Sequence, residues 1–258
     1  MLRFLRSLIG RSTTPHFEEP DSRVEQTAAP FDDIDDDLSW LDPPLDIHDV
    51  AAWDRYWYGL ASHGISPAMF DLFARDQALV DEMLKHNLST VLCAGSGISQ
   101  EPRALAYAGM KVTALDSSPT AMELARSFPA DDEYLQRFFE RPEKRAGGWT
   151  EFEVGDFRDT RVCAGPYDVV IERCTIQLFP DDERSAALDA LAARLAPGGI
   201  FFSHCHFGSW APDEPLEHPA EPWFVNRRFT ICNVMGQIEQ EWPGIGESRS
   251  AWLFMSTG

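Results

Sequence analysis

The stretch that decides the fold is TVLCAGSGISQEPRALAYAGMKVTALD, residues 90–116. Its first five residues form a short apolar run, which is typical of a strand buried on both faces. Gly95 and Gly97 end that strand, and the apolar spacing over residues 100–108 indicates a helix. A second apolar run at residues 111–115 predicts another strand. The stretch therefore predicts a strand–turn–helix–strand unit, the building block of a parallel sheet.

Strands and helices continue to alternate along the rest of the chain. The patterns predict a helix at 119–126 capped by Ser118, strands at 151–154 and 167–172, a helix at 183–195, and strands at 200–204, 229–234 and 250–255. No long helix follows the last strand, so the final two strands fit an antiparallel hairpin. We expect an α/β, Rossmann-like, doubly wound and mostly parallel seven-stranded sheet with an antiparallel edge hairpin.

The chain divides into three parts by composition. Residues 1–46 are acidic and rich in proline, which predicts a mostly disordered leader. Residues 47–88 carry apolar side chains at helical spacing and predict an N-terminal helical cap. Residues 89–258 form the predicted core, with a proline-rich lid at about 207–228. The first eleven residues mix apolar residues with arginine, which fits a targeting or surface-seeking helix or a frayed terminus.

Charge and cysteine content restrict the partners and the compartment. The net charge of −20 argues against a nucleic-acid partner and against adsorption to anionic lipid, and no apolar run is long enough to span a membrane. The five cysteines include no C-x-x-C pair, so we expect no disulfide framework and no metal, and a reducing, cytoplasmic location. A small-molecule substrate is the expected partner, and the pattern gives no indication of oligomeric state.

The glycine turn and the carboxylate that follows it indicate a nucleoside-containing ligand. Gly95 and Gly97 lack a Cβ and so allow a ligand to approach the backbone. Asp116 ends the next strand about 20 residues later, where a carboxylate accepts the hydroxyls of a ribose. A dinucleotide site would have glycine at Gln100, and a methyltransferase pattern would have it at Ser99. This segment alone leaves both ligands open, beside the alternative of a tight turn with an N-cap aspartate.

Two later motifs favour one of these ligands. Gly155-Asp156-Phe157 follows the third strand, and Leu195 to Gly199 precedes the fifth. With the glycine turn, they make residues 89–205 resemble the class I S-adenosylmethionine-dependent methyltransferases. The resemblance implies that Asp156 binds the adenine amino group, that Phe157 flanks the ring and that Asp116 binds the ribose. It assigns cofactor binding to Cys93, Ala94, Gly95, Ser96, Gly97, Asp116, Ser117, Gly155, Asp156, Phe157 and Glu172.

Within that class the chain resembles the thiopurine methyltransferase-like group. The resemblance rests on the aromatic stretch 53–57, on Cys93 where other groups have an acidic residue, and on Glu172-Arg173 before the apolar stretch 176–180. Ser96 stands where cysteine is common in that group.

The candidate catalytic residues are Glu172, Arg173 and His206. Arg173 ends the fourth strand, where its planar guanidinium could clamp an anionic or thiolate-like substrate, and the alternative is a structural ion pair with other side chains. His204 and His206 face the same side of the fifth strand, so either one serves as a base or both are ordinary hydrogen-bonded histidines. Similarly, Trp53 and Trp57 form either an aromatic lid or part of the core.

These features predict methyl transfer from S-adenosylmethionine to a small-molecule acceptor. Residues 47–90 and 207–228 are expected to shape the acceptor pocket. Two alternatives remain: a catalytically silent binding or regulatory module, or an NAD(P)-dependent oxidoreductase. The absence of a Tyr-x-x-x-Lys pair counts against the oxidoreductase.

Overall fold

The computed structural model describes residues 43–65, 77–139, 143–205, 223, 229–235 and 250–256. Most of the predicted leader, the start of the predicted second cap helix, His206 and all of the predicted lid except Trp223 lie outside these residues. None of the described helices is long and apolar enough to cross a membrane.

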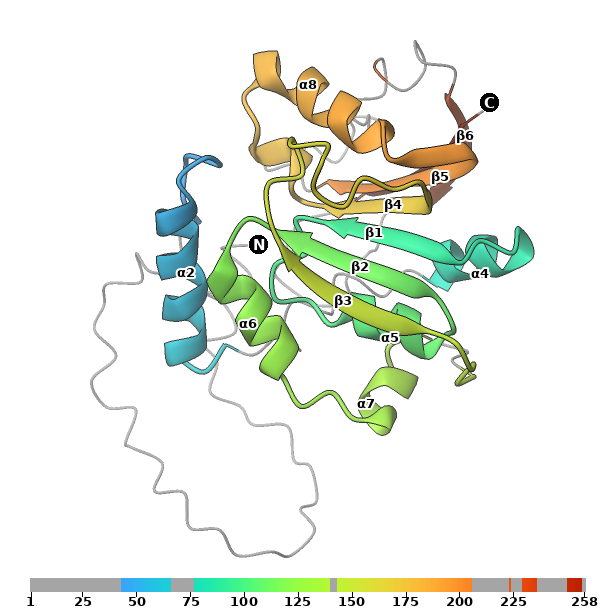
Figure 1. Cartoon of the computed structure of the whole chain (residues 1–258), viewed down its shortest axis with the longest axis horizontal. Coiled ribbons are helices and arrows are strands. Elements are labelled where there is room, and N and C mark those ends of the chain that lie inside the picture. Colours follow the sequence, from blue (N-terminus) through green and yellow to red (C-terminus); the bar gives the residue numbers. More distant parts are fainter. Residues whose placement is uncertain are drawn as a thin grey trace, which may run out of the picture.

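One twisted sheet forms the centre of the described structure (Figure 1). Its strands are β1 (Thr90–Ala94), β2 (Lys111–Asp116), β3 (Trp149–Val154), β4 (Tyr167–Arg173), β5 (Leu195–Cys205), β6 (Phe229–Met235) and β7 (Ser250–Ser256). They lie in the order β3-β2-β1-β4-β5-β7-β6. Strands β1 to β5 run parallel, β7 pairs antiparallel with β5, and β6 pairs antiparallel with β7. The parallel, Rossmann-like α/β architecture predicted from the sequence is confirmed.

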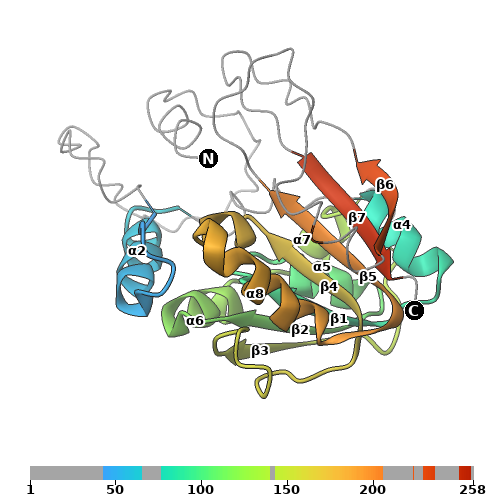
Figure 2. The ribbon, with the colours of Figure 1, turned by 90° about the horizontal axis from the view of Figure 1, so that it is seen from above.

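Helices cover both faces of this sheet because its strands are apolar on both sides. The helices are α2 (Val50–Ser62), α4 (Gln77–Lys85), α5 (Glu101–Tyr107), α6 (Pro119–Ser127), α7 (Asp132–Gln136) and α8 (Asp181–Ala192), with a short 3₁₀ helix η3 (Ile176–Leu178). One core cluster joins α4 and α5 to one face, and a second joins α8 to the other. Figure 2 shows α5 and α8 on opposite sides of the strands.

Several predicted boundaries are correct and two are wrong. Ser118 caps α6 as predicted, since its hydroxyl accepts a hydrogen bond from the Ala121 amide at 3.1 Å. Helix α8 ends at Ala192 and not at the predicted position 195, because the carbonyl of Arg194 already pairs with the amide of Tyr167 at the start of β4. The Pro-Gly-Gly turn expected before β5 lies within it, where the pairing register with β4 shifts.

Helix α2 packs against α6 beside the carboxyl ends of the strands. Asp54 makes the connection, since its Oδ1 accepts hydrogen bonds from the Ser118 hydroxyl at 2.5 Å and from the Thr120 amide at 3.0 Å. Trp53, on the same helix, is buried. The cap helix is therefore anchored to the first turn of a core helix by a charged group that suits a helix N-terminus.

The loop after β3 is held to α8 by a buried arginine. Arg194 is 1% exposed, and its guanidinium donates to the carbonyl oxygens of Asp159, Val162, Cys163 and Ala190. A buried carbonyl without a donor costs free energy, so one side chain here satisfies the backbone of an irregular loop. The loop carries the Asp156 motif and so depends on this contact.

We expect Arg194→Met to lower the free energy of unfolding by about 3 kcal/mol, because four carbonyls lose a charged donor. Urea denaturation followed by circular dichroism measures the change. Arg161→Met is the matched control, since that side chain is 88% exposed and should leave stability unchanged. Equal effects of the two substitutions would show that the buried contacts are not stabilising.

Candidate functional site

A cavity of about 420 Å³ lies at the carboxyl ends of the parallel strands, between the sheet and α2. Nine of the eleven residues predicted to bind the cofactor line it, namely Cys93, Ala94, Gly95, Ser96, Gly97, Asp116, Ser117, Asp156 and Phe157. Gly155 and Glu172 are not among the described lining residues. The fold therefore gathers side chains from the ends of β1, β2 and β3 around one space, as parallel α/β sheets do.

In the turn after β1, the surrounding protein itself requires glycine at positions 95 and 97, whether or not a ligand is bound. Gly95 and Gly97 have φ of +63° and +53°, a conformation that glycine adopts most readily. A Cβ on Gly95 would lie 2.3 Å from the Thr175 hydroxyl, and one on Gly97 would lie 3.0 Å from the Trp57 ring. The turn is consequently packed between the end of β4 and the cap helix.

Asp116 is held in place from both sides at the end of β2. Its Oδ2 accepts the Gly97 amide and its Oδ1 accepts the Ser118 amide, each at 2.9 Å. Burial raises the pKa of this carboxyl, although these amide bonds act in the opposite direction. A carboxylate oxygen can accept more than one hydrogen bond, so both oxygens retain capacity toward the cavity.

Asp156 forms an ion pair that the sequence analysis did not predict. Its carboxylate accepts the Arg158 amide at 2.8 Å and is gripped by the Arg158 guanidinium, with Nη2 to Oδ2 at 2.5 Å. Burial alone would raise the pKa of Asp156, but the hydrogen bonds and charge of Arg158 outweigh it and lower that pKa. Phe157 stands between these two residues in the sequence. Its side chain is buried, and the centre of its ring lies 5.7 Å from that of Phe179.

Glu172 and Arg173 are adjacent in β4 and point to opposite faces of the sheet. Glu172 is fully buried and accepts the amides of Thr175 and Ile176, both at 3.2 Å, and the Ser203 hydroxyl. These contacts fix the backbone that follows β4. Of the two residues, only Arg173 lines the cavity.

Arg173 is bound to a carboxylate that the sequence analysis did not single out. Its Nε and Nη2 donate to the two carboxylate oxygens of Glu101 at 2.7 and 2.5 Å, and its Nη1 lies 2.8 Å from His204 Nδ1. Glu101, the first residue of α5, is 3% exposed and also lines the cavity. The pair gives this wall of the cavity no net charge. His206, the other predicted catalytic histidine, lies outside the described residues.

The remaining predicted site residues are largely apolar in character. Burial raises the pKa of the Cys93 thiol, which keeps it protonated at neutral pH. Trp53 and Trp57 both line the cavity, and the aromatic rings of the two lie 6.2 Å apart. Among the described residues, no group of three or more His, Cys, Asp or Glu side chains is arranged to hold a metal ion.

Residues 91–199 match a protein-family model described as a methyltransferase domain. The fold is similar to that of magnesium protoporphyrin IX methyltransferase from Synechocystis PCC 6803, solved with bound S-adenosylmethionine, with a TM-score of 0.50, 17% identity, and coverage of 84% of this chain and 88% of that one. It is also similar to a structure described for the conversion of a disulfide bond into a thioacetal group during echinomycin biosynthesis (TM-score 0.51, 22% identity, 76% and 90% coverage). At these identities, the two structures support the fold.

We expect Glu101→Gln to lower the free energy of unfolding by about 3 kcal/mol, because it leaves Arg173, whose side chain is only 14% exposed, without a charged partner. Chemical denaturation measures the loss. The double variant Glu101→Gln with Arg173→Met should lose less than the sum of the two single variants. Glu133→Gln removes a surface ion pair with Arg137 and serves as the control, with no change expected. If the loss in the double variant equals the sum of the two single losses, Glu101 and Arg173 do not stabilise each other.

Proposed function

We propose that this chain, in which residues 91–199 match a methyltransferase-domain model, is a class I S-adenosylmethionine-dependent methyltransferase that transfers the methyl group of that cofactor to a small-molecule acceptor. The supporting observation is that Asp116, Asp156 and Arg173, which lie at or just after the carboxyl ends of β2, β3 and β4, line one cavity. When bound, S-adenosylmethionine supplies an electrophilic methyl group on a positively charged sulfur. The activity then depends on how the residues of this chain hold the two reactants.

The described residues fit the nucleoside part of such a cofactor. Asp116 presents a fixed carboxylate, which suits a pair of ribose hydroxyls, because its two oxygens are already oriented by the Gly97 and Ser118 amides. We assign the adenine to the adjacent space, where Asp156 and the buried Phe157 ring line the cavity. The turn at Gly95 is left to bind the amino-acid part.

We place the acceptor between this cofactor and α2. The cavity wall there is made of apolar and aromatic side chains, namely Val50, Trp53, Tyr56, Trp57 and Leu178. Such a wall binds an acceptor with an apolar or aromatic body and excludes water. Because the sulfonium charge spreads over the reacting atoms during methyl transfer, a site with little water favours the transition state over the reactants. The main contribution of the protein is to align the nucleophile with the methyl group.

The residues at the end of β4 have distinct proposed roles. Arg173 and Glu101 form an ion pair without net charge, which is the polar part of the acceptor wall. Glu172 positions the backbone around Thr175 from the opposite face and is a positioning residue. An amine or hydroxyl acceptor needs a group to take its proton, and His206 remains the residue predicted for that task. Of the stretches predicted to shape the acceptor pocket, 47–90 and 207–228, we assign residues 50–90 and the predicted lid at 207–228 to it.

We expect S-adenosylhomocysteine to raise the melting temperature of the protein by roughly 5 °C or more at a hundredfold excess over its Kd. Asp116→Ala should weaken binding by about a hundredfold or more, because it removes the charged acceptor for two hydroxyls, and should therefore nearly abolish this rise at the same ligand concentration. Glu123→Ala, an exposed position on α6, is the control and should keep it.

Differential scanning fluorimetry measures both melting curves. A rise with NAD but none with S-adenosylhomocysteine would contradict the proposed function. Tight binding of S-adenosylhomocysteine without turnover of any thiol, amine or hydroxyl acceptor would instead indicate a silent binding module.

The affinity for S-adenosylhomocysteine should fall in acid at a higher pH than an ordinary aspartate would cause, because burial raises the pKa of Asp116. The ribose hydroxyls bind the ionised carboxylate, so protonation competes with the ligand. The affinity is therefore full above the pKa of Asp116 and falls by about tenfold per pH unit below it. Calorimetric titrations between about pH 4 and pH 8 measure the profile. Asp116→Asn should remove the titration step, and a step that persists in this variant would assign it to another group.

A further inference from the structure

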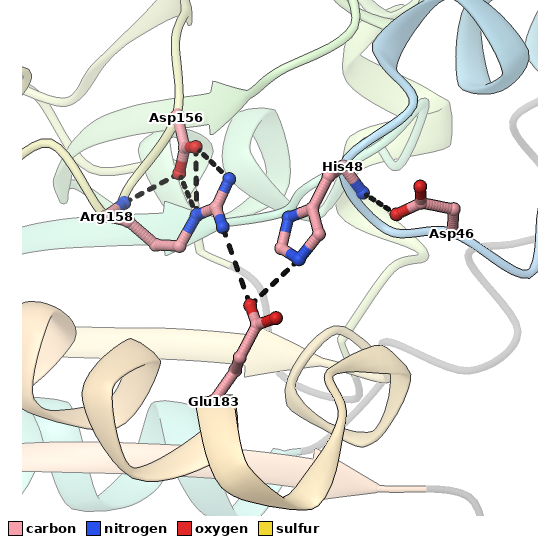
Figure 3. Close-up of polar contacts among 5 residues, drawn as sticks. All are labelled: Asp46, His48, Asp156, Arg158 and Glu183. Carbon is pink, nitrogen blue, oxygen red and sulfur yellow. Dashed lines mark hydrogen bonds and ion pairs between the residues drawn. The ribbon is translucent and has the colours of Figure 1, made fainter.

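Four charged or ionisable side chains from three separate parts of the chain contact one another beside the cavity (Figure 3). His48 comes from the segment before α2, Asp156 and Arg158 from the loop after β3, and Glu183 from the first turn of α8. We call these four residues the clasp. His48, Asp156 and Arg158 line the cavity, whereas Glu183 is not among the described lining residues.

Glu183 contacts the two basic side chains of the clasp that line the cavity, His48 and Arg158. Its Oε2 lies 2.8 Å from His48 Nε2 and 3.8 Å from Arg158 Nη1. The Arg158 guanidinium in turn donates to both carboxylate oxygens of Asp156, from Nε to Oδ1 and from Nη2 to Oδ2. The backbone of His48 is also fixed, because its amide donates to Asp46 Oδ1 at 2.8 Å. A single carboxylate that is not among the lining residues therefore contacts two side chains that face into the cavity.

A buried ring aligns the same side chains from beneath. Phe179 is 4% exposed, the His48 ring lies 5.9 Å from it edge-on, and the Arg158 guanidinium lies 5.7 Å over its face. Phe157, assigned to the adenine, packs on the same ring at 5.7 Å. The three residues that contact Phe179 in this way all line the cavity.

The clasp contributes little to the stability of the fold. The side chains of His48, Arg158 and Glu183 are 33%, 39% and 43% exposed, and ion pairs this exposed are screened by water and weak. Holding long side chains in one arrangement also costs conformational entropy. A network that stabilises the fold so little, yet converges on a cavity wall, fits a role in binding a ligand.

We propose that the clasp makes the segment at residues 43–49 a wall of the nucleoside subsite, with His48 and Arg158 as further cofactor-contacting residues and Glu183 as the residue that positions them. This inference rests on the proposed function, since the ligand is the nucleoside part of S-adenosylmethionine. A bound nucleoside would cover the clasp and remove water from it, which strengthens its ion pairs. Binding of the cofactor and docking of residues 43–49 are then coupled.

The test compares Glu183→Gln with wild-type protein by isothermal titration calorimetry, using S-adenosylhomocysteine and adenosine as probes. We expect Glu183→Gln to weaken binding of both probes by about fivefold, because the positioning charge is lost while the size of the side chain is kept. The loss should be equal for the two probes, since adenosine occupies only the nucleoside subsite. The KM for S-adenosylmethionine should rise by more than kcat falls.

Asp182→Asn is the matched control. It removes the same charge from the same first turn of α8, an exposed position with no contact to the clasp, and should leave both affinities unchanged. A second variant, His48→Gln, should cause a similar loss, and the double variant with Glu183→Gln should lose no more than the larger single loss.

The outcomes separate the clasp from the proposed function. If wild-type protein binds neither probe, the proposed function fails. If wild-type protein binds and Glu183→Gln binds equally well or more tightly, the clasp is not a positioning element. Losses that are equal in Glu183→Gln and Asp182→Asn would assign the effect to the charge at the helix terminus and overturn the proposal.

Discussion

The buried ion pair between Arg173 and Glu101 connects the parts of the structure on which the site depends. It joins the carboxyl end of β4 to the first turn of α5, and Arg173 also contacts His204 on β5. Two charges so far from water are tolerated only when each neutralises the other, so the ends of these elements must stay in register. The glycine turn runs directly between β1 and α5, and its position follows from the same constraint. This part of the cavity wall is therefore held in place by an ion pair as well as by apolar packing.

Neighbouring residues at the end of β4 perform separate tasks because a strand alternates its side chains between two faces. Arg173 faces the cavity, while Glu172 is buried on the other side and binds the amides of the following turn. That turn places Thr175 against Gly95, where any larger residue would collide with it. The two residues look like a single acidic–basic motif in the sequence, but only Arg173 lines the cavity, whereas Glu172 holds the backbone of the following turn.

The cap and the core build the site together. Asp54 anchors α2 to the first turn of α6, Trp57 packs on Gly97, and the clasp closes the segment before α2 against α8. A ligand bound in the cavity would touch both the sheet and the cap, which explains why most of the apolar wall comes from residues outside the parallel strands.

The sequence by itself determined the parallel α/β fold, the strands around residues 90–116 and the placing of Asp116 and Asp156 at strand ends, because these follow from local periodicity and short motifs. It also identified Ser118 as a cap, since capping depends on residues three positions apart. Only the tertiary structure decided the partners of the charged groups. Glu101 and Arg173 are 72 positions apart in the sequence. His48 precedes the first strand, whereas Glu183 follows the fourth. Such pairs depend on strand order and helix placement, which no local pattern records, so the ion pair at the acceptor wall and the clasp became visible only in three dimensions.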